Sequence, residues 1–243
     1  MQYWGITDPG CVRAQNQDAY QIEQLDRGGL LCVVCDGMGG AKSGNIASTL
    51  AVDVFVEEVR RTWTPGIPLD KLEQMLRGAV KLANFTVFDQ AMQFEAFSGM
   101  GTTLVAVLIK GKEATVVNVG DSRAYFIDRV GIHQVTVDHS VVQLMVNRGE
   151  LTPEQAKTYP GKSLITRAIG TESMVPCDMF HKKVSKGDYF LLCSDGLTNY
   201  ANSEALAKLV KKAVRDQNTK HLIDYANNRG GSDNITAVLL YRA

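Results

Sequence analysis

The feature that most constrains the fold is a series of short β-branched runs in the middle of the chain. Residues 102–109, 114–119, 123–127 and 132–137 are rich in Val, Ile, Thr and aromatic residues, and tight turns separate them. Closely spaced runs of this kind are typical of consecutive antiparallel strands. Apolar runs at 30–35, 189–193 and 234–241 predict further strands.

Two long segments between these runs have the spacing of amphipathic helices. Residues 45–60 place Ile46, Leu50 and Val54 on one stripe, and a second stripe runs from residue 69 to about 91. Residues 65–68, a Pro-Gly-Ile-Pro sequence, separate the two helices. Residues 138–148 and 203–228 also predict helices. We expect one mixed domain over residues 1–243, with antiparallel sheets.

Composition excludes several classes of protein. Lys plus Arg and Asp plus Glu both number 26, and no basic cluster occurs, so nucleic-acid binding is not expected. No signal peptide and no apolar run of about 20 residues is present, so we expect no membrane segment. Five scattered cysteines favour a reducing cytoplasm over a disulfide framework. Cys32 and Cys35 have the spacing of a redox or zinc pair, but on a strand they face opposite sides and are expected in the core.

Acidic residues recur at the tips of the predicted strands. Apolar runs lead into Asp36-Gly37, Asp121 and Asp195-Gly196, and Asp233 precedes the last strand. A single Asp-Gly pair most often only forms a turn, whereas four acids at strand tips favour a shared site. Converging carboxylates raise one another's pKa unless a cation balances them, and oxygen ligands suit Mg²⁺, Mn²⁺ or Ca²⁺.

Glycines at 37, 39, 40 and 44 follow the first of these acids. They allow close backbone approach, so the Gly37 carbonyl is a candidate metal ligand. The helix expected from Asn45 would direct its N-terminus at anions near the site.

Other phosphate and metal chemistries do not fit. No EF-hand loop occurs, and Gly161-Lys162-Ser163 lacks the earlier glycine of a P-loop, because that position is Ala156. None of the cysteines has an arginine six positions later, and the four histidines are scattered. Elimination leaves water activated by a metal as the nucleophile.

The order of the motifs resembles one known family. The chain is similar to the metal-dependent type 2C serine/threonine protein phosphatases, in particular the bacterial branch. The motifs occur in sequence over nearly the whole chain: Arg13 to Asp18, Asp36-Gly37-Met38-Gly39-Gly40, Met100 to Leu104, Val119 to Tyr125, Asp138-His139-Ser140, Leu164 to Gly170, Ser194 to Leu197, and Gly231 to Thr236. The resemblance implies an α+β fold, a four-layer sandwich of two antiparallel β-sheets flanked by helix pairs on both sides.

The resemblance also implies a metal-ligand set. Asp36 matches the carboxylate that bridges two metal ions, and Asp195 and Asp233 match the remaining ligands of the first ion. The Gly37 carbonyl matches a ligand of the second ion, which Asp18 is expected to reach through water. The cofactors implied are Mn²⁺ or Mg²⁺, with two tightly bound ions.

Bacterial members suggest a third, weaker ion. Asp121 matches its ligand, shared with Asp195, and Ser163 is a further candidate. Arg13 matches the guanidinium that binds the substrate phosphate, and its fork suits phosphate oxygens. Arg13 and Asp36 are therefore the expected catalytic residues.

The implied reaction is hydrolysis of phosphoserine and phosphothreonine on proteins, by metal-activated water in a single in-line displacement. Expected partners are phosphoprotein substrates of a cognate serine/threonine kinase. We expect a monomer located in the cytoplasm.

One position departs from the eukaryotic pattern. Met38 stands where eukaryotic relatives have a histidine proposed as general acid, which leaves the acid unassigned; a water on the third ion is our candidate. His139 is expected to be structural support. Residues 141–170 correspond to a variable flap, in which Tyr159 stands where histidine is common.

Two other functions stay open at this point. One is a catalytically silent binding module that keeps the phosphatase fold. The other is a phosphatase dedicated to one regulator or to a small phosphoester.

Overall fold

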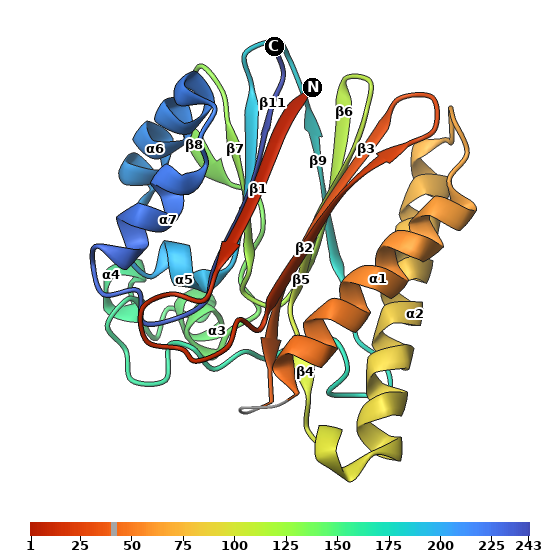
Figure 1. Cartoon of the computed structure of the whole chain (residues 1–243), viewed down its shortest axis with the longest axis vertical. Coiled ribbons are helices and arrows are strands. Elements are labelled where there is room, and N and C mark those ends of the chain that lie inside the picture. Colours follow the sequence, from red (N-terminus) through yellow and green to blue (C-terminus); the bar gives the residue numbers. More distant parts are fainter. Residues whose placement is uncertain (40–42) are drawn as a thin grey trace.

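The computed structural model describes residues 1–39 and 43–243, and its elements form four stacked layers (Figure 1). One helix pair covers a first sheet, a second sheet packs on the first, and further helices cover the outer face of the second. The expected four-layer α+β sandwich is confirmed. Gly40, part of the glycine-rich motif, lies outside the described residues.

One sheet has the strand order β1-β11-β10-β7-β8, and every neighbouring pair is antiparallel. Its strands are β1 (Gln2–Asp8), β7 (Arg123–Ile127), β8 (Ile132–Gln134), β10 (Tyr189–Cys193) and β11 (Ile235–Tyr241).

The other sheet has the order β2-β3-β5-β6-β9, with a short strand paired to the end of β3. Its strands are β2 (Asp18–Leu25), β3 (Gly29–Met38), β4 (Gly101–Thr102), β5 (Leu104–Lys110), β6 (Glu113–Val119) and β9 (Asp178–Lys183).

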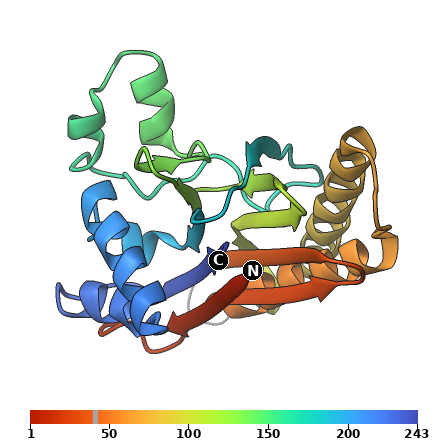
Figure 2. The ribbon, with the colours of Figure 1, turned by 90° about the horizontal axis from the view of Figure 1, so that it is seen from above.

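The helices cover the outer faces of both sheets. α1 and α2 lie on the sheet that contains β3, and α6 and α7 lie on the other (Figure 1). The remaining short helices lie in connecting segments, where α3 and α4 project from the sandwich in the view from above (Figure 2). The bounds are α1 (Gly44–Thr62), α2 (Leu69–Gln93), a 3-10 turn at Glu95–Phe97, α3 (Val141–Asn147), α4 (Pro153–Ala156), α5 (Asp195–Thr198), α6 (Ser203–Asp216) and α7 (Lys220–Asn227).

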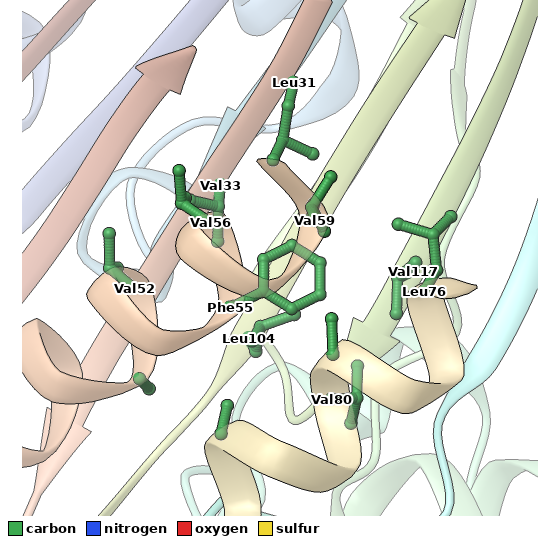
Figure 3. Close-up of a cluster of buried hydrophobic side chains, with 14 of the residues drawn as sticks. Leu31, Val33, Val52, Phe55, Val56, Val59, Leu76, Val80, Leu104 and Val117 are labelled. Atoms are coloured by element: carbon green, nitrogen blue, oxygen red, sulfur yellow. The ribbon is translucent and has the colours of Figure 1, made fainter. Parts of the chain in front are cut away.

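Strand β3 is buried on both faces, which explains why its sequence is a continuous apolar run. Leu31 and Val33 pack under α1 and α2 around Phe55, whereas Leu30 and Val34 pack between the sheets (Figure 3). The same alternation places Cys32 and Cys35 in different clusters, so they are core thiols, as expected.

The strand ends explain how distant motifs meet. In antiparallel neighbours the end of one strand lies beside the start of the next. In the first sheet, β1 and β10 end where β11 and β7 begin, so these four strand termini lie at the same end of the sheet. In the other sheet, the start of β2 lies beside the end of β3. The acids singled out above lie at this end of the sheets: Asp36 on β3, Asp195 at the start of α5, and Asp121 and Asp233 in loops.

Two predicted boundaries are wrong. The run 132–137 is a strand only as far as Gln134. The helix expected from 138 begins at Val141, because Ser140 caps it by accepting a hydrogen bond from the Gln143 amide.

Among the residues described, no helix is long and apolar enough to cross a bilayer.

Candidate active site

A cavity of about 560 Å³ opens at the strand ends described above. The four acids from the strand tips, Asp36, Asp121, Asp195 and Asp233, all line it. The sequence-predicted Arg13, Gly37 and Ser163 line it as well. Its remaining walls are Ala14, Gln15, Gln17, Met38, Gly39, Thr103, Ile165 and Asn234.

Asp36 is the cavity acid whose pKa is affected by all the neighbouring acids, Asp18, Asp121, Asp195 and Asp233. The β3 strand continues through Asp36 to Met38, rather than ending before it, and the residue as a whole is partly buried. Burial, together with the charges of Asp18, Asp195 and Asp121, raises the pKa of Asp36 well above its ordinary value. Thr103 holds the backbone here, since its hydroxyl accepts a hydrogen bond from the Asp36 amide at 2.9 Å.

Asp18 lies behind the cavity wall and does not line the cavity itself. It is the direct cross-strand neighbour of Asp36. One carboxylate oxygen, Oδ2, accepts hydrogen bonds from the hydroxyls of Ser194 (2.7 Å) and Thr236 (2.6 Å). The other, Oδ1, is buried without a partner among the described residues. Burial raises the pKa of Asp18 to about 7, despite these two hydrogen bonds.

Asp121 lines the cavity from the loop after β6, and Asp195 lines it from the first residue of α5, just after β10. Burial and the charge of Asp195 raise the pKa of Asp121 to about 7. Burial and Asp233 raise the pKa of Asp195 in turn. The side-chain Nδ2 of Asn199 donates a hydrogen bond to Asp195 Oδ2 at 3.1 Å, and Lys162 Nζ donates one to Asn199 Oδ1 at 3.2 Å. The flap segment thus contacts an acid of the cavity through one intervening side chain.

Arg13 and Asp233 form a two-point ion pair at the rim. Arg13 Nε lies 2.9 Å from Oδ1, and Nη2 donates to Oδ2 at 3.0 Å. This hydrogen bond and the charge of Asp233 raise the pKa of Arg13. The Arg13 side chain is 54% exposed, so its guanidinium remains accessible from the cavity and from solvent.

Gly37 lies where a side chain cannot be accommodated. A Cβ at this position would come within 2.0 Å of the Gly44 carbonyl oxygen and 2.6 Å of the Gln17 carbonyl oxygen. The first turn of α1 therefore packs directly against the Gly37 backbone.

His139 lies away from the cavity and supports its wall. Its Nδ1 accepts a hydrogen bond from the Gly120 amide at 3.1 Å, which places the ring proton on Nε2, directed at Asp178 Oδ2 (3.1 Å). Burial lowers the pKa of His139. The residue thus holds the backbone next to Asp121, in keeping with the structural role expected for it.

The acids of this cavity fit hard divalent cations. In the described part of the chain, no three His, Cys, Asp or Glu side chains form a complete metal cluster by themselves. However, carboxylates with mutually raised pKa values and the unpartnered Asp18 Oδ1 form an oxygen-only donor set that requires positive charge. Mg²⁺ commonly takes only one or two carboxylates and keeps several waters, so a closed cluster is not required.

Several residues that organise the site were missed from the sequence. Ser194, Thr236, Asn199 and Asn234 each contact a predicted site residue or its loop. They lie inside the quoted motifs or beside them, but their roles depend on contacts between segments far apart in sequence.

Comparison with known proteins identifies the class. Residues 12–228 match the family model described as protein phosphatase 2C. The chain therefore belongs to the protein phosphatase 2C family, which confirms the resemblance seen in the motifs and the expectation of an enzyme.

Two curated relatives align over nearly the whole chain. A serine/threonine phosphatase stp of Listeria monocytogenes is 34% identical over 237 residues, covering 97% of this chain and 94% of the relative. The protein phosphatase PhpP of Streptococcus pneumoniae is 37% identical over 238 residues, covering 97% and 95%.

Solved structures agree in fold. The serine/threonine phosphatase Stp1 of Staphylococcus aureus has a TM-score of 0.91 at 37% identity, covering 98% of this chain and 93% of the other. The catalytic domain of a serine/threonine protein phosphatase PstP, in complex with two manganese ions, has a TM-score of 0.83 at 32% identity and covers 98% and 96%.

Proposed function

We propose that this enzyme hydrolyses phosphoserine and phosphothreonine in proteins, using Mn²⁺ or Mg²⁺ held by the aspartates of the cavity. Two tightly bound ions and a third, weaker one are proposed. Relatives described as serine/threonine phosphatases, and a PstP homologue with two manganese ions, support the reaction and the cofactor.

The ligand assignment follows the family resemblance, and it is supported by the cavity that Asp36, Asp195 and Asp233 line together. We assign Asp36 as the bridging ligand, with Asp195 and Asp233 on the first ion. The Gly37 carbonyl and, through water, Asp18 serve the second ion. The position of Asp18 behind Asp36, with Oδ1 unpartnered in the described structure, supports a contact through water.

A third ion would lie on the flap side of the cavity. We assign Asp121 to it, shared with Asp195, and Ser163 as a further candidate ligand. Both Asp121 and Ser163 line the cavity, and Ser163 belongs to the flap segment 141–170.

Arg13 is the proposed phosphate-binding residue. Of the described residues lining the cavity it is the only cation, and its Nε and Nη2 already engage a carboxylate through two bonds. The same fork fits two oxygens of a phosphoryl group. When bound, the cations make hydroxide available near neutral pH and neutralise charge on the phosphoryl oxygens.

Met38 lines the cavity and carries no proton to donate. The side chain at this position therefore cannot protonate the leaving alkoxide, and our candidate for the acid is a water that the third ion would hold.

The proposal also covers the wider setting of the enzyme. We propose one catalytic domain over residues 1–243 that acts as a monomer in the cytoplasm. Its partners would be phosphoproteins modified by a cognate serine/threonine kinase.

The observation that carries the proposal is the cavity in which four aspartates and one arginine converge from five separate segments of the chain. The test is phosphate release from a phosphothreonine peptide, with Mn²⁺ present and after chelation with EDTA. We expect turnover that EDTA abolishes and that added Mn²⁺ restores.

Absence of turnover in folded protein supplied with excess Mn²⁺ would contradict catalysis on this substrate. Metal content measured on the same sample then separates the alternatives. Bound metal without turnover points to a phosphatase dedicated to another substrate, and no bound metal points to a silent binding module.

A further inference from the structure

We propose that Asn234 is a positioning residue for Arg13: it fixes both ends of the loop that carries this arginine and thereby tightens phosphate binding. The inference rests on the phosphate-binding role proposed above for Arg13.

The loop that carries Arg13 is exposed to solvent on both sides of the arginine. It connects β1 to β2, and residues 11–15 are exposed. The Arg13 side chain is long, and each rotatable bond fixed on binding costs affinity. A flexible loop beneath it would add to that cost, so phosphate affinity depends on how firmly the loop is held.

The carboxamide of Asn234 holds this loop at three points. Its Oδ1 accepts a hydrogen bond from the Gln17 amide at 2.9 Å. Its Nδ2 donates to the Pro9 carbonyl at 2.9 Å and to the Gln15 carbonyl at 2.9 Å. One buried side chain, 5% exposed, thus binds the loop on both sides of Arg13.

A second set of contacts packs the start of the Arg13 loop, at Gly10 and Cys11, against the segment just before Asn234. The Cys11 amide donates to the Gly231 carbonyl at 2.7 Å. At Gly10, where φ is +79°, a Cβ would come within 2.2 Å of the Asp233 carbonyl oxygen. Arg13 and the acid that it contacts, Asp233, therefore lie on two loops that are bound to each other, and the Asn234 side chain makes three of the hydrogen bonds between them.

This arrangement separates two effects of substitution. Loss of Asn234 frees the backbone under Arg13 but removes no carboxylate from the cavity. Phosphate binding should weaken more than the chemical step, which appears as an increase in KM larger than the decrease in kcat.

The test is a double-mutant cycle with Asn234→Ala and Arg13→Ala. The readouts are kcat and KM on a phosphothreonine peptide, and the Kd of inorganic phosphate measured calorimetrically on Mn²⁺-loaded protein. We expect Asn234→Ala to raise KM and the phosphate Kd roughly tenfold in the native background, and less than about twofold when Arg13 is already alanine.

Asn84 offers a matched control. It is also a buried asparagine whose side chain makes three hydrogen bonds to the backbone of another segment: its Oδ1 accepts from the Gly170 amide at 2.8 Å, and its Nδ2 donates to the carbonyls of Glu172 and Ser173. Asn84→Ala removes the same number of hydrogen bonds away from Arg13. Its effects on KM and phosphate Kd should be the same whether or not Arg13 is present.

Equal effects of Asn234→Ala in both Arg13 backgrounds would overturn the inference. If Arg13→Ala alone leaves KM and phosphate binding unchanged, the phosphate-binding role of Arg13 itself fails, which is a separate outcome. Should Asn234→Ala not fold, Asn234→Asp takes its place in the cycle, because it keeps the acceptor for the Gln17 amide and loses both donors.

Discussion

Asp36 is the residue on which the proposed chemistry depends most. Asp36→Asn keeps the shape of the side chain but removes its charge. If the carboxylate bridges two ions, kcat should fall by at least about 1,000-fold with Mn²⁺ in excess. The fold should be retained, because the substitution relieves repulsion from Asp18 and Asp195. Turnover and circular dichroism on the same preparation check both parts.

Asp128→Asn is the matched control for this prediction. Asp128 accepts backbone hydrogen bonds in the turn between β7 and β8, at the opposite end of the strand from the cavity. The Asp128→Asn substitution should therefore leave kcat unchanged. An Asp36→Asn enzyme as active as this control would exclude the bridging role.

At the level of single residues, the sequence identified the acids of the cavity but not their support. Asp36 lies near the end of β3, and Asp121, Asp195 and Asp233 closely follow or precede strands, so the convergence of these acids could be inferred from local pattern and family resemblance. The hydroxyls that hold Asp18 come from Ser194 and Thr236, across a hydrogen-bond network between strands of different sheets. That proximity depends on how the two sheets pack, which no local pattern encodes.

At the level of elements, the packing of α1 on its sheet gives a stability prediction. Phe55 is fully buried between α1, α2 and the sheet (Figure 3). Phe55→Ala should lower the free energy of unfolding by about 3–5 kcal/mol, through lost burial and the cavity left behind. Urea denaturation monitored by circular dichroism measures this loss.

Phe85 on α2 provides the comparison, because its side chain is 60% exposed. Phe85→Ala should cost less than about 1 kcal/mol. Equal losses in the two variants would show that the α1–α2 layer is not the well-packed region seen here.

The elements that sequence analysis missed are mainly edge strands. β1, β2 and β9 are edges of their sheets and mix apolar with polar residues over short lengths, without a long continuous apolar run. Central strands such as β3 and β5 are buried on both faces, and their continuous apolar runs predicted them. An edge strand exposes part of its surface, so its sequence has a weaker signal, and tertiary pairing decides its conformation.

For the whole molecule, the buried acids predict how stability depends on pH and metal. The pKa values of Asp18 and Asp121 rise from 3.8 to about 7 on folding, mainly through burial. The folded state then holds protons that the unfolded state releases, so these groups lower stability as pH rises from about 4 to about 7. Cation binding should offset that loss, and the rise in Tm from Mg²⁺ over EDTA should grow by roughly 5–10 °C between pH 5 and pH 8.

His139 acts in the same pH range with the opposite sign, because burial lowers its pKa and folding then favours the neutral ring. Comparing Mg²⁺ with EDTA at each pH removes this contribution, since it is present in both samples. Asp18→Asn should reduce the pH dependence of the difference. A Mg²⁺ effect on Tm that stays constant from pH 5 to pH 8 would contradict the argument.

The pairing of Asp18 with Asp36 on neighbouring strands also bears on how such a protein can evolve. Two like charges directly opposite each other in a ladder are a point of local frustration, where strand pairing and electrostatics disagree. Selection for heat resistance alone would favour neutral residues at both positions, whereas selection for turnover retains the acids. Thermostability and catalysis therefore place opposite demands on the Asp18–Asp36 pair. A more thermostable variant that keeps its activity has to gain stability from substitutions at other positions.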